Sequence, residues 1–266
     1  MANTAVERLG EGHMESKPDR KDGKYLYAVI QAAREIELGE IGIDGERVYV
    51  ISDSHTGAVV SDFGNGQIRP ERRHIAAHQA VLRRLMDQGT PLPISFGVIA
   101  DGTKNIRQIL SRNRKAFAEH LDHVRDKVEM GVRVSWDVPN IFEYFVNTHA
   151  ELRAARDQFF GAQRAPTQED KIEVGRIFDR CLQEDREEHT ERVEATISPC
   201  CFEIKRDPPR NEKEVTNLAC LVGREAAGKE FEAAIFEAAR GFDNSFSFDF
   251  NGPWAPHHFV EIKLLT

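Results

Sequence analysis

Apolar residues in the first half of the chain recur at strand spacing and helix spacing in turn. Strands are expected at three places: residues 24–30, 47–52 and 58–63. The Ser-His-Thr-Gly connection between the last two favours a hairpin. A helix that opens at Pro70, a buried strand over 92–100 and a second helix over 105–126 follow. We expect these strands to form one sheet that the helices cover on one face.

The second half of the chain repeats the alternation in a different order. Strands are predicted at 128–136, 200–205, 215–222 and 245–250, and helices at 141–160, 167–196 and 226–242. The resulting order, β-α(α)-β-β-α-β, is that of a ferredoxin-like split βαβ fold with an enlarged helical region. A projecting helical hairpin is expected within that region, and the order of the strands in space stays open.

These patterns predict an α+β protein with two mixed domains, the second a modified ferredoxin-like split βαβ, and an extended C-terminal tail. Four segments are expected: a disordered tail over 1–23, an N-terminal α+β domain over 24–126, a ferredoxin-like domain over 127–251 and a C-terminal tail over 252–266.

Charge and hydropathy limit the kinds of function that this chain can have. The formal net charge is -8, with 44 acidic against 36 basic residues, which disfavours general binding to nucleic acid or to anionic membrane lipid. The longest mainly apolar stretch, residues 91–100, is too short to span a bilayer, and the polar N-terminus is not a secretory signal. We therefore expect a cytosolic protein with free thiols at its four cysteines.

No motif predicts a catalytic, cofactor or metal site. Phosphate-binding glycine loops, the nucleophile elbow and the zinc helix motif are all missing from the sequence. Asp101-Gly-Thr-Lys104 is expected to be a plain turn. The histidine pairs His74/His78 and His120/His123 lack further ligands at a recognisable spacing and are interpreted as surface or boundary residues.

The cysteines have one interpretation, whereas the phenylalanines near the C-terminus and an acidic run have two each. On a strand, Cys200, Phe202 and Ile204 share one face, so Cys200 is expected in the core and Cys201 exposed or half-exposed. Phenylalanines 246, 248 and 250 are expected in the core, with base stacking on an RNA-binding sheet as the alternative. The run over 184–194 predicts a solvated helix face, with a docking surface for a basic partner as the alternative.

Several segments, taken in order, resemble the gas vesicle protein F/L family. They are Tyr25-Leu-Tyr-Ala-Val-Ile30, His74-Ile-Ala-Ala-His-Gln-Ala-Val-Leu82, Leu92-Pro-Ile-Ser-Phe-Gly-Val-Ile99, Lys127-Val-Glu-Met-Gly-Val-Arg-Val134 and Gly252-Pro-Trp-Ala-Pro-His-His-Phe-Val260. The resemblance runs from about residue 24 to the C-terminus. Ser95 stands where the family usually has arginine, and Ala255, His257 and His258 stand at variable places.

The resemblance implies a minor structural or accessory protein of gas vesicles, made in the cytoplasm of a prokaryote. Its implied partners are the small hydrophobic GvpA-like shell protein and other gas vesicle accessory proteins, and no cofactor is implied. The implied role is to keep shell subunits soluble during nucleation and early assembly. A ligand-sensing regulatory protein on ferredoxin-like domains is the alternative, and an enzyme with an unrecognised site is a third possibility.

The C-terminal tail is the candidate partner-binding segment. Its candidate residues are Pro253, Trp254, Pro256, Phe259 and Val260. The prolines hold the backbone extended, which suits a sheet edge or a groove of another protein. The alternative is that the tail packs on its own two domains as a strap, and one segment can do both.

Overall fold

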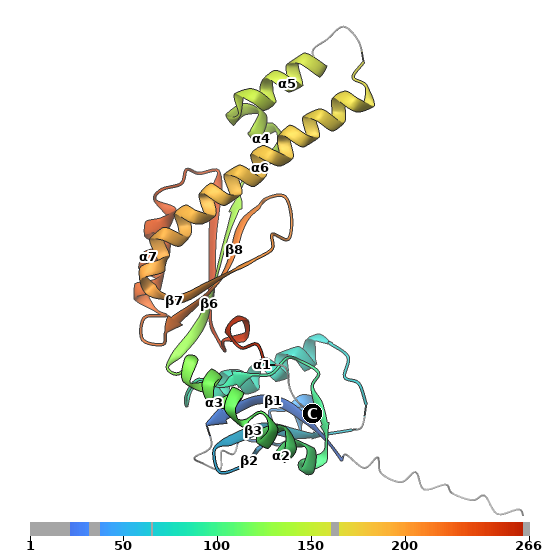
Figure 1. Cartoon of the computed structure of the whole chain (residues 1–266), viewed down its shortest axis with the longest axis vertical. Helices are drawn as coiled ribbons and strands as arrows, with labels where there is room; N and C mark the ends of the chain where they lie inside the picture. The colour runs from blue at the N-terminus through green and yellow to red at the C-terminus, as the bar shows by residue number, and fades with distance from the viewer. Residues whose placement is uncertain (1–21, 32–37, 65, 161–164, 263–266) are drawn as a thin grey trace, which may run out of the picture.

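The computed structural model describes residues 22–31, 38–64, 66–160 and 165–262, which contain two β-sheets and seven α-helices (Figure 1). The expected N-terminal tail over 1–23 lies outside the described residues, apart from its last two positions. Gly23 already belongs to the first strand. Each sheet forms a unit with the helices that pack on it, and the domain boundaries predicted from the sequence stay a prediction.

The first unit is a mixed α/β layer structure around a central strand. Its strands are β1 (Gly23–Gln31), β2 (Val48–Ser52), β3 (Thr56–Phe63), β4 (Leu92–Pro93) and β5 (Ile99–Asp101). The order is β2-β3-β1-β4, with β5 also on β1, and all pairs are antiparallel. The short 3₁₀ helix η1 (Ile43–Gly45) precedes β2.

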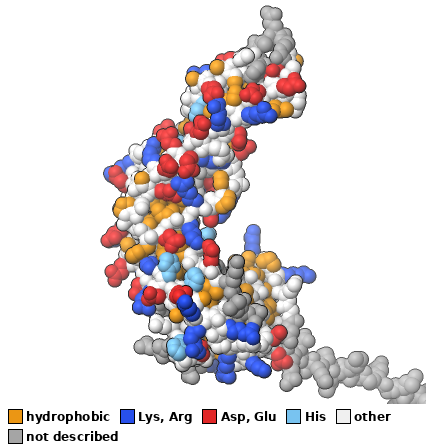
Figure 2. All heavy atoms as spheres, in the orientation of Figure 1, with side chains coloured by type: hydrophobic (Ala, Val, Ile, Leu, Met, Phe, Trp, Pro, Cys, Tyr) orange, Lys and Arg blue, Asp and Glu red, His pale blue; other side chains and the backbone are white. Residues whose placement is uncertain are grey.

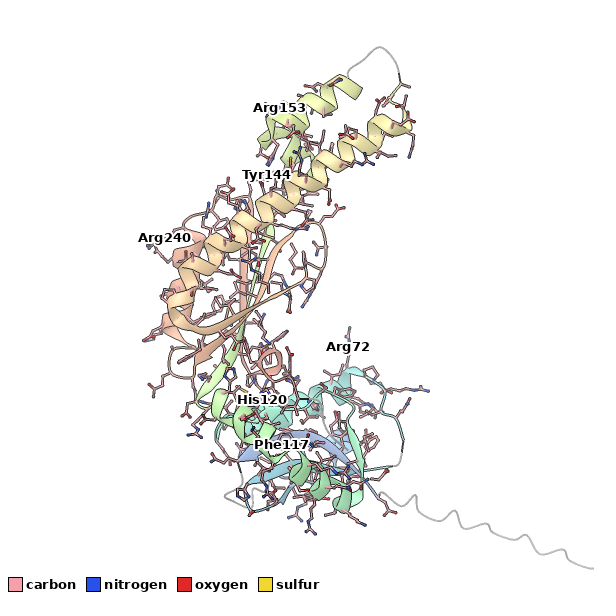
Figure 3. The ribbon with its side chains drawn as sticks, in the orientation of Figure 1. Arg72, Phe117, His120, Tyr144, Arg153 and Arg240 are labelled. Atoms are coloured by element: carbon pink, nitrogen blue, oxygen red, sulfur yellow. The ribbon has the colours of Figure 1, made fainter. Side chains whose placement is uncertain are left out.

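Helices cover both faces of this first sheet. Helix α1 (Arg72–Met86) packs against the side that bears Tyr25 and Tyr27, whereas α2 (Gly102–Arg112) and α3 (Arg114–His123) cover the opposite side. Phe117 of α3 points into that second layer (Figure 3). The prediction of helices on one face is therefore wrong. Since β1 is buried on both sides, each face of the sheet needs its own apolar cover.

Two elements expected to be continuous are broken in this unit. The strand predicted over 92–100 is two short strands, because the chain turns at Gly97 with φ +93°. The helix predicted over 105–126 is interrupted at Asn113, whose side-chain amide donates to the carbonyl of Ile109 at 2.8 Å. This bond offers the backbone an alternative to helix continuation.

The second unit is a four-stranded antiparallel sheet with its helices on one face. The strands are β6 (Lys127–Trp136), β7 (Cys201–Asp207), β8 (Glu214–Gly223) and β9 (Phe246–Trp254), in the order β7-β8-β6-β9. The helices are α4 (Ile141–Thr148), α5 (Ala150–Phe160), α6 (Gln168–Ile197) and α7 (Lys229–Ala239). The predicted element order is present, and β8 lies between β6 and β7, as a split βαβ arrangement requires.

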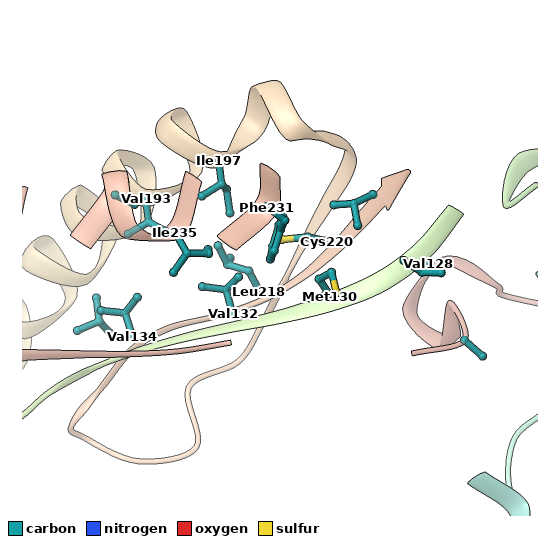
Figure 4. Packing of buried hydrophobic residues seen from close by; sticks show 14 of the residues in the cluster. Val128, Met130, Val132, Val134, Val193, Ile197, Leu218, Cys220, Phe231 and Ile235 are labelled. Atoms are coloured by element: carbon teal, nitrogen blue, oxygen red, sulfur yellow. The ribbon is translucent and has the colours of Figure 1, made fainter. Parts of the chain in front are cut away.

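The core of the second unit follows from the alternation along β6. Val128, Met130, Val132 and Val134 point to the same side, toward α6 and α7 (Figure 4). The apolar side chains that these helices supply include Val193, Ile197, Phe231 and Ile235. Burying each such side chain contributes about 1.5–3 kcal/mol relative to its exposure to water. The C-terminal segment lies against the opposite side of the sheet, where β6 presents Glu129.

Helices α4 to α6 form the predicted helical projection. In Figure 1, α5 lies beside the N-terminal half of α6, beyond the end of the sheet, and Figure 3 marks Arg153 on α5. Thr167 caps α6 in a capping box with Asp170. The helix predicted over 141–160 is broken at His149, whose ring Nε2 lies 3.2 Å from Asp185 Oδ1. Seen as a surface, the molecule is hollowed on one side, between this projection and the first unit (Figure 2).

Candidate functional site: the closing segment

Residues 252–262, here called the closing segment, run from the end of β9 to the last described residue. They include the 3₁₀ helix η3 (His257–Phe259), which lies between the two units in Figure 1. The tail was predicted to begin at residue 252, but β9 continues to Trp254. The candidate residues Pro253 and Trp254 therefore belong to the sheet edge, and only the later ones leave it.

Gly252 fixes how the chain enters this segment. Its φ is +127°, and a Cβ atom would lie 2.7 Å from the Met130 sulfur and 2.9 Å from the Glu129 carbonyl oxygen. Only glycine fits this backbone and this close approach. The Gly252–Pro253 peptide bond is cis, and Pro253 is exposed.

Trp254 connects the two units through its ring. The guanidinium of Arg83, on α1 of the first unit, lies 5.2 Å from the ring centroid. The indole Nε1 donates to Asn251 Oδ1 at 2.7 Å. The Asn251 amide lies over Gly131, because a Cβ added to Gly131 would lie 2.9 Å from Asn251 Oδ1. Trp254 is half-buried, so part of the ring stays accessible.

His258 attaches the segment to the second sheet, on the side away from its helices. Its backbone N–H donates to Glu129 Oε2 at 2.9 Å, and its ring Nδ1 lies 2.6 Å from Glu129 Oε1. The other ring nitrogen lies 3.3 Å from Asp207 Oδ2. Glu129 is only 6% exposed, so the two contacts from His258 satisfy an otherwise costly buried carboxylate.

Pro256 and Phe259 are buried against the chain itself. Phe259 packs in a cluster with Leu221 of β8 and Phe117 of α3, so its ring contributes to both units. Val260 packs partly against the same cluster. Beside it, Glu261 pairs with Lys205 at 3.0 Å. The segment thus packs on its own two units, while Pro253, Trp254 and Val260 retain accessible surface.

His78 of α1 and His257 of the closing segment lie close enough for His257 to affect the pKa of His78. His78 is buried, and its Nδ1 lies 2.9 Å from the Tyr25 hydroxyl oxygen. Burial, with a smaller contribution from His257, lowers the pKa of His78 to about 4. Burial also lowers the pKa of His257, with His258 contributing. Both rings are therefore neutral at pH 7.

The interpretation of the pair His74 and His78 as surface or boundary residues is wrong. Both are buried, since the inward face of α1 includes them and leaves Ile75 exposed. His74 Nδ1 lies 2.9 Å from the carbonyl oxygen of Arg69. Across the described ranges, no group of three or more His, Cys, Asp or Glu side chains is arranged to hold a metal ion.

The prediction that Cys200, Phe202 and Ile204 share one face is wrong, whereas Cys201 is half-exposed as predicted. Strand β7 begins at Cys201, and an irregularity between Cys201 and Glu203 shifts the register, so Cys201 and Ile204 share the core side. Cys200 belongs to the 3₁₀ helix η2 (Ser198–Cys200) and is half-buried. The shift leaves Phe202 68% exposed, which makes it a surface residue that the strand pattern did not indicate.

The prediction that the phenylalanines of β9 lie in the core holds for Phe246 and Phe248, which pack against it, and is wrong for Phe250. Phe246 and Phe248 pack against Phe242, with ring centroids 4.9 Å and 5.1 Å away, whereas Phe250 is 39% exposed at the edge. Within the part of the chain that the structure describes, no helix combines the length and apolarity needed to cross a membrane.

Comparisons with known proteins agree across nearly the whole chain. Residues 23–261 match the sequence pattern of the family described as "Gas vesicle synthesis protein GvpL/GvpF". Gas vesicle protein F of Streptomyces sp. (strain CB03234) is 26% identical, covering 89% of this chain and 99% of that protein. Gas vesicle protein L1 of Halobacterium salinarum is 24% identical, covering 90% of each.

A solved structure shows the same fold. The crystal structure of the gas vesicle protein GvpF from Anabaena sp. PCC7120 superimposes with a TM-score of 0.80 at 23% identity. The match covers 91% of this chain and 99% of that one, so it includes both sheets and the helices between them.

Proposed function

Because the chain belongs to the gas vesicle synthesis protein GvpL/GvpF family, we propose that it is a minor, non-enzymatic accessory protein of gas vesicles. In this proposal it binds the small hydrophobic shell protein, acts with other accessory proteins, and assists nucleation and early assembly of the vesicle. It works in the cytoplasm before assembly and at the vesicle afterwards. The observation that supports the proposal most is the family match over residues 23–261.

Physical chemistry gives this role a reason. A shell protein whose assembled wall excludes water exposes a large apolar surface before assembly, and such surfaces aggregate. A partner with a net charge of -8 adds charge to the complex and opposes further association. Reversible cover by a soluble, acidic partner therefore keeps shell subunits available for growth.

We place the contact at the accessible part of the closing segment. Pro253, Trp254 and Val260 offer apolar surface there, whereas Pro256 and Phe259 are buried and hold the segment in place. Aromatic side chains that are half-buried and held by neighbours make good anchors, because little side-chain entropy remains to be lost on binding. Trp254, held by Asn251 and Arg83, meets this description.

Co-purification tests the proposal directly. Tagged full-length chain is co-expressed with the shell protein, and the shell protein retained on the affinity resin is measured. The Trp254→Ala variant should retain clearly less shell protein. Phe236→Ala is the matched control, since Phe236 is an exposed aromatic residue on α7, outside the closing segment.

Two results would count against the proposal. If the wild-type chain retains no shell protein while another accessory protein does so in the same system, the shell-binding role is wrong. If both aromatic variants lose equal amounts, the contact is not at the closing segment. Thermal melting of each variant shows whether lost retention follows lost folding.

A further inference from the structure

Strand β7 has an open edge in the second sheet. It is the terminal strand of the order β7-β8-β6-β9 and has β8 as its neighbour on one side. Among the described residues, no other segment bonds to the backbone of residues 202–207. The strand therefore presents backbone N–H and C=O groups along its free side, a template on which another chain can form a strand.

Each of the other long sheet edges is covered or interrupted at one end. The outer side of β2 bears the Gly39–Val48 bridge, where the Val48 N–H donates to the Gly39 carbonyl at 2.9 Å. Strand β9 ends in the irregular stretch that contains Gly252 and Pro253, and proline cannot donate a backbone hydrogen bond. Within the described ranges, β7 is thus the edge best suited to pair with another chain.

A groove accompanies the free edge of β7. It has a volume of about 760 Å³ and lies between β7 and the last turns of α6; we call it the β7–α6 groove. Its lining includes Glu191, Ala195 and Ser198 from the end of α6 and the turn after it, with Cys201 and Phe202 from the strand end. A second hollow of about 400 Å³ shares Cys201 and Phe202. The exposed Phe202 ring therefore lies where the two hollows meet. The Lys127 ammonium lies 4.7 Å from the ring centroid, and the rest of the ring offers an apolar contact.

The charge around the groove is acidic. Glu191, Glu194 and Glu203 line the first hollow, and two more glutamates, Glu225 and Glu230, line the second. Arg206, a basic side chain of the lining, is held by Glu194 at 2.6 Å and Glu187 at 2.7 Å. The hydrogen bonds that Arg206 donates to these two carboxylates raise its pKa, so its charge is already compensated. Glu203 lies 3.2 Å from His123 Nε2, so the negative surplus comes from Glu191, Glu225 and Glu230, and it favours a basic occupant.

A second copy of this chain does not fit the groove. A two-fold symmetric contact brings the same patch of each copy together. The acidic rims of both grooves would then face each other, which opposes association. A symmetric contact between two copies is therefore disfavoured, and a partner of the opposite sign of charge is favoured.

We propose that the β7–α6 groove binds an extended, basic segment of a partner polypeptide as an additional strand beside β7. Main-chain hydrogen bonds to β7 supply affinity, Phe202 contacts an apolar side chain, and the glutamates select lysine or arginine in the partner. This surface lies outside the closing segment, and its occupant need not be the shell protein.

Fluorescence anisotropy with a labelled peptide tests the proposal on the full-length chain. The probe alternates lysine with valine, and a companion of equal charge has its central valine replaced by proline. We expect saturable binding of the alternating peptide, at least about tenfold tighter than binding of the proline-containing one, because proline interrupts the added strand. Equal binding of both peptides would show mere charge attraction and overturn the proposal.

Matched variants locate the site. Phe202→Ser and Glu191→Lys should each weaken binding of the alternating peptide, whereas Glu173→Lys, the same charge change at the far end of α6, should leave it unchanged. Equal weakening by both lysine variants would contradict a groove-specific site. Hydrogen exchange gives an independent readout, since residues 202–207 should gain protection when the peptide binds. Unchanged exchange there, or dimerisation of the free chain that Phe202→Ser abolishes, would equally overturn it.

Discussion

The ring Nδ1 of His258 lies 2.6 Å from Oε1 of Glu129, although the two residues are 129 positions apart. The backbone N–H of His258 donates to the other oxygen of the same carboxylate at 2.9 Å. A buried acid in the first strand of the second sheet thus fixes the position of a segment that follows the last strand. The closing segment is therefore an integral part of the fold.

Removing the Glu129 carboxylate should loosen the closing segment. Glu129→Ala removes the acceptor of the His258 N–H and ring, and the loss of a hydrogen bond to a charged group costs about 1.5–3 kcal/mol. Urea unfolding followed by circular dichroism measures this as a lower midpoint. Glu261→Ala is the control, because it removes a solvent-exposed ion pair with Lys205 and should move the midpoint much less. Equal shifts for the two variants would refute the role given to Glu129.

Two glycine-to-alanine substitutions should change the free energy of unfolding in opposite directions. Gly252→Ala places a Cβ 2.7 Å from the Met130 sulfur at φ +127° and should destabilise the protein by at least about 2 kcal/mol. Gly175→Ala lies within α6, where the new methyl group meets no atom within 4 Å, so it should stabilise the protein by up to about 1 kcal/mol. Unfolding midpoints of both variants check the pair. A neutral Gly252→Ala would disprove the close approach at β9.

Phe259 should contribute to the stability of both units. Phe259→Ala removes a ring that is 4% exposed and packs between them, and the expected cost is about 3–5 kcal/mol. Phe236→Ala, at 60% exposure, should cost far less. Hydrogen exchange should show increased opening at both β8 and α3 in the first variant. Increased opening in only one of them would contradict a shared core.

Acid should destabilise the protein partly through His78. In the unfolded chain this histidine binds a proton near pH 6.5, whereas burial lowers its pKa to about 4 in the folded protein. Its contribution to stability is therefore complete above pH 6.5 and is lost as the pH falls toward 4, on the order of 3 kcal/mol. His78→Gln, which can still accept from Tyr25, should flatten the dependence of unfolding free energy on pH in this window. The exposed His55→Gln should not, and an unchanged slope in His78→Gln would refute the assignment.

Hydrophobic periodicity predicted most helices and strands, because the apolar residues of each recur at helix or strand spacing on one face. The alternation along β6 and β9 placed Val132 and Phe248 on the helical side of the sheet, where they lie. The length of α6 and its start after Thr167 were predicted from the Pro166–Thr167 restart and the charge-rich run that follows. These signals lie within short stretches of the chain, so they can be identified from the sequence without knowledge of the fold.

The rest depended on contacts between distant residues. Whether a strand is covered on one face or both depends on which helices return to it, so β1 did not reveal its second layer. The irregularity that exposes Phe202 is set by pairing with β8 and has no local signature. The contacts of Glu129 with His258 and of Arg83 with Trp254 each join different parts of the fold. No spacing rule indicates such pairs.

The proposed protection of the shell protein can be measured as its solubility. Purified shell protein is diluted from denaturant into buffer with an equimolar amount of this chain, and the soluble fraction is measured after centrifugation. Most shell protein should stay in the supernatant with the wild-type chain, and more should be lost with Trp254→Ala. Precipitation to the same extent as with an unrelated acidic protein of similar size would contradict the account.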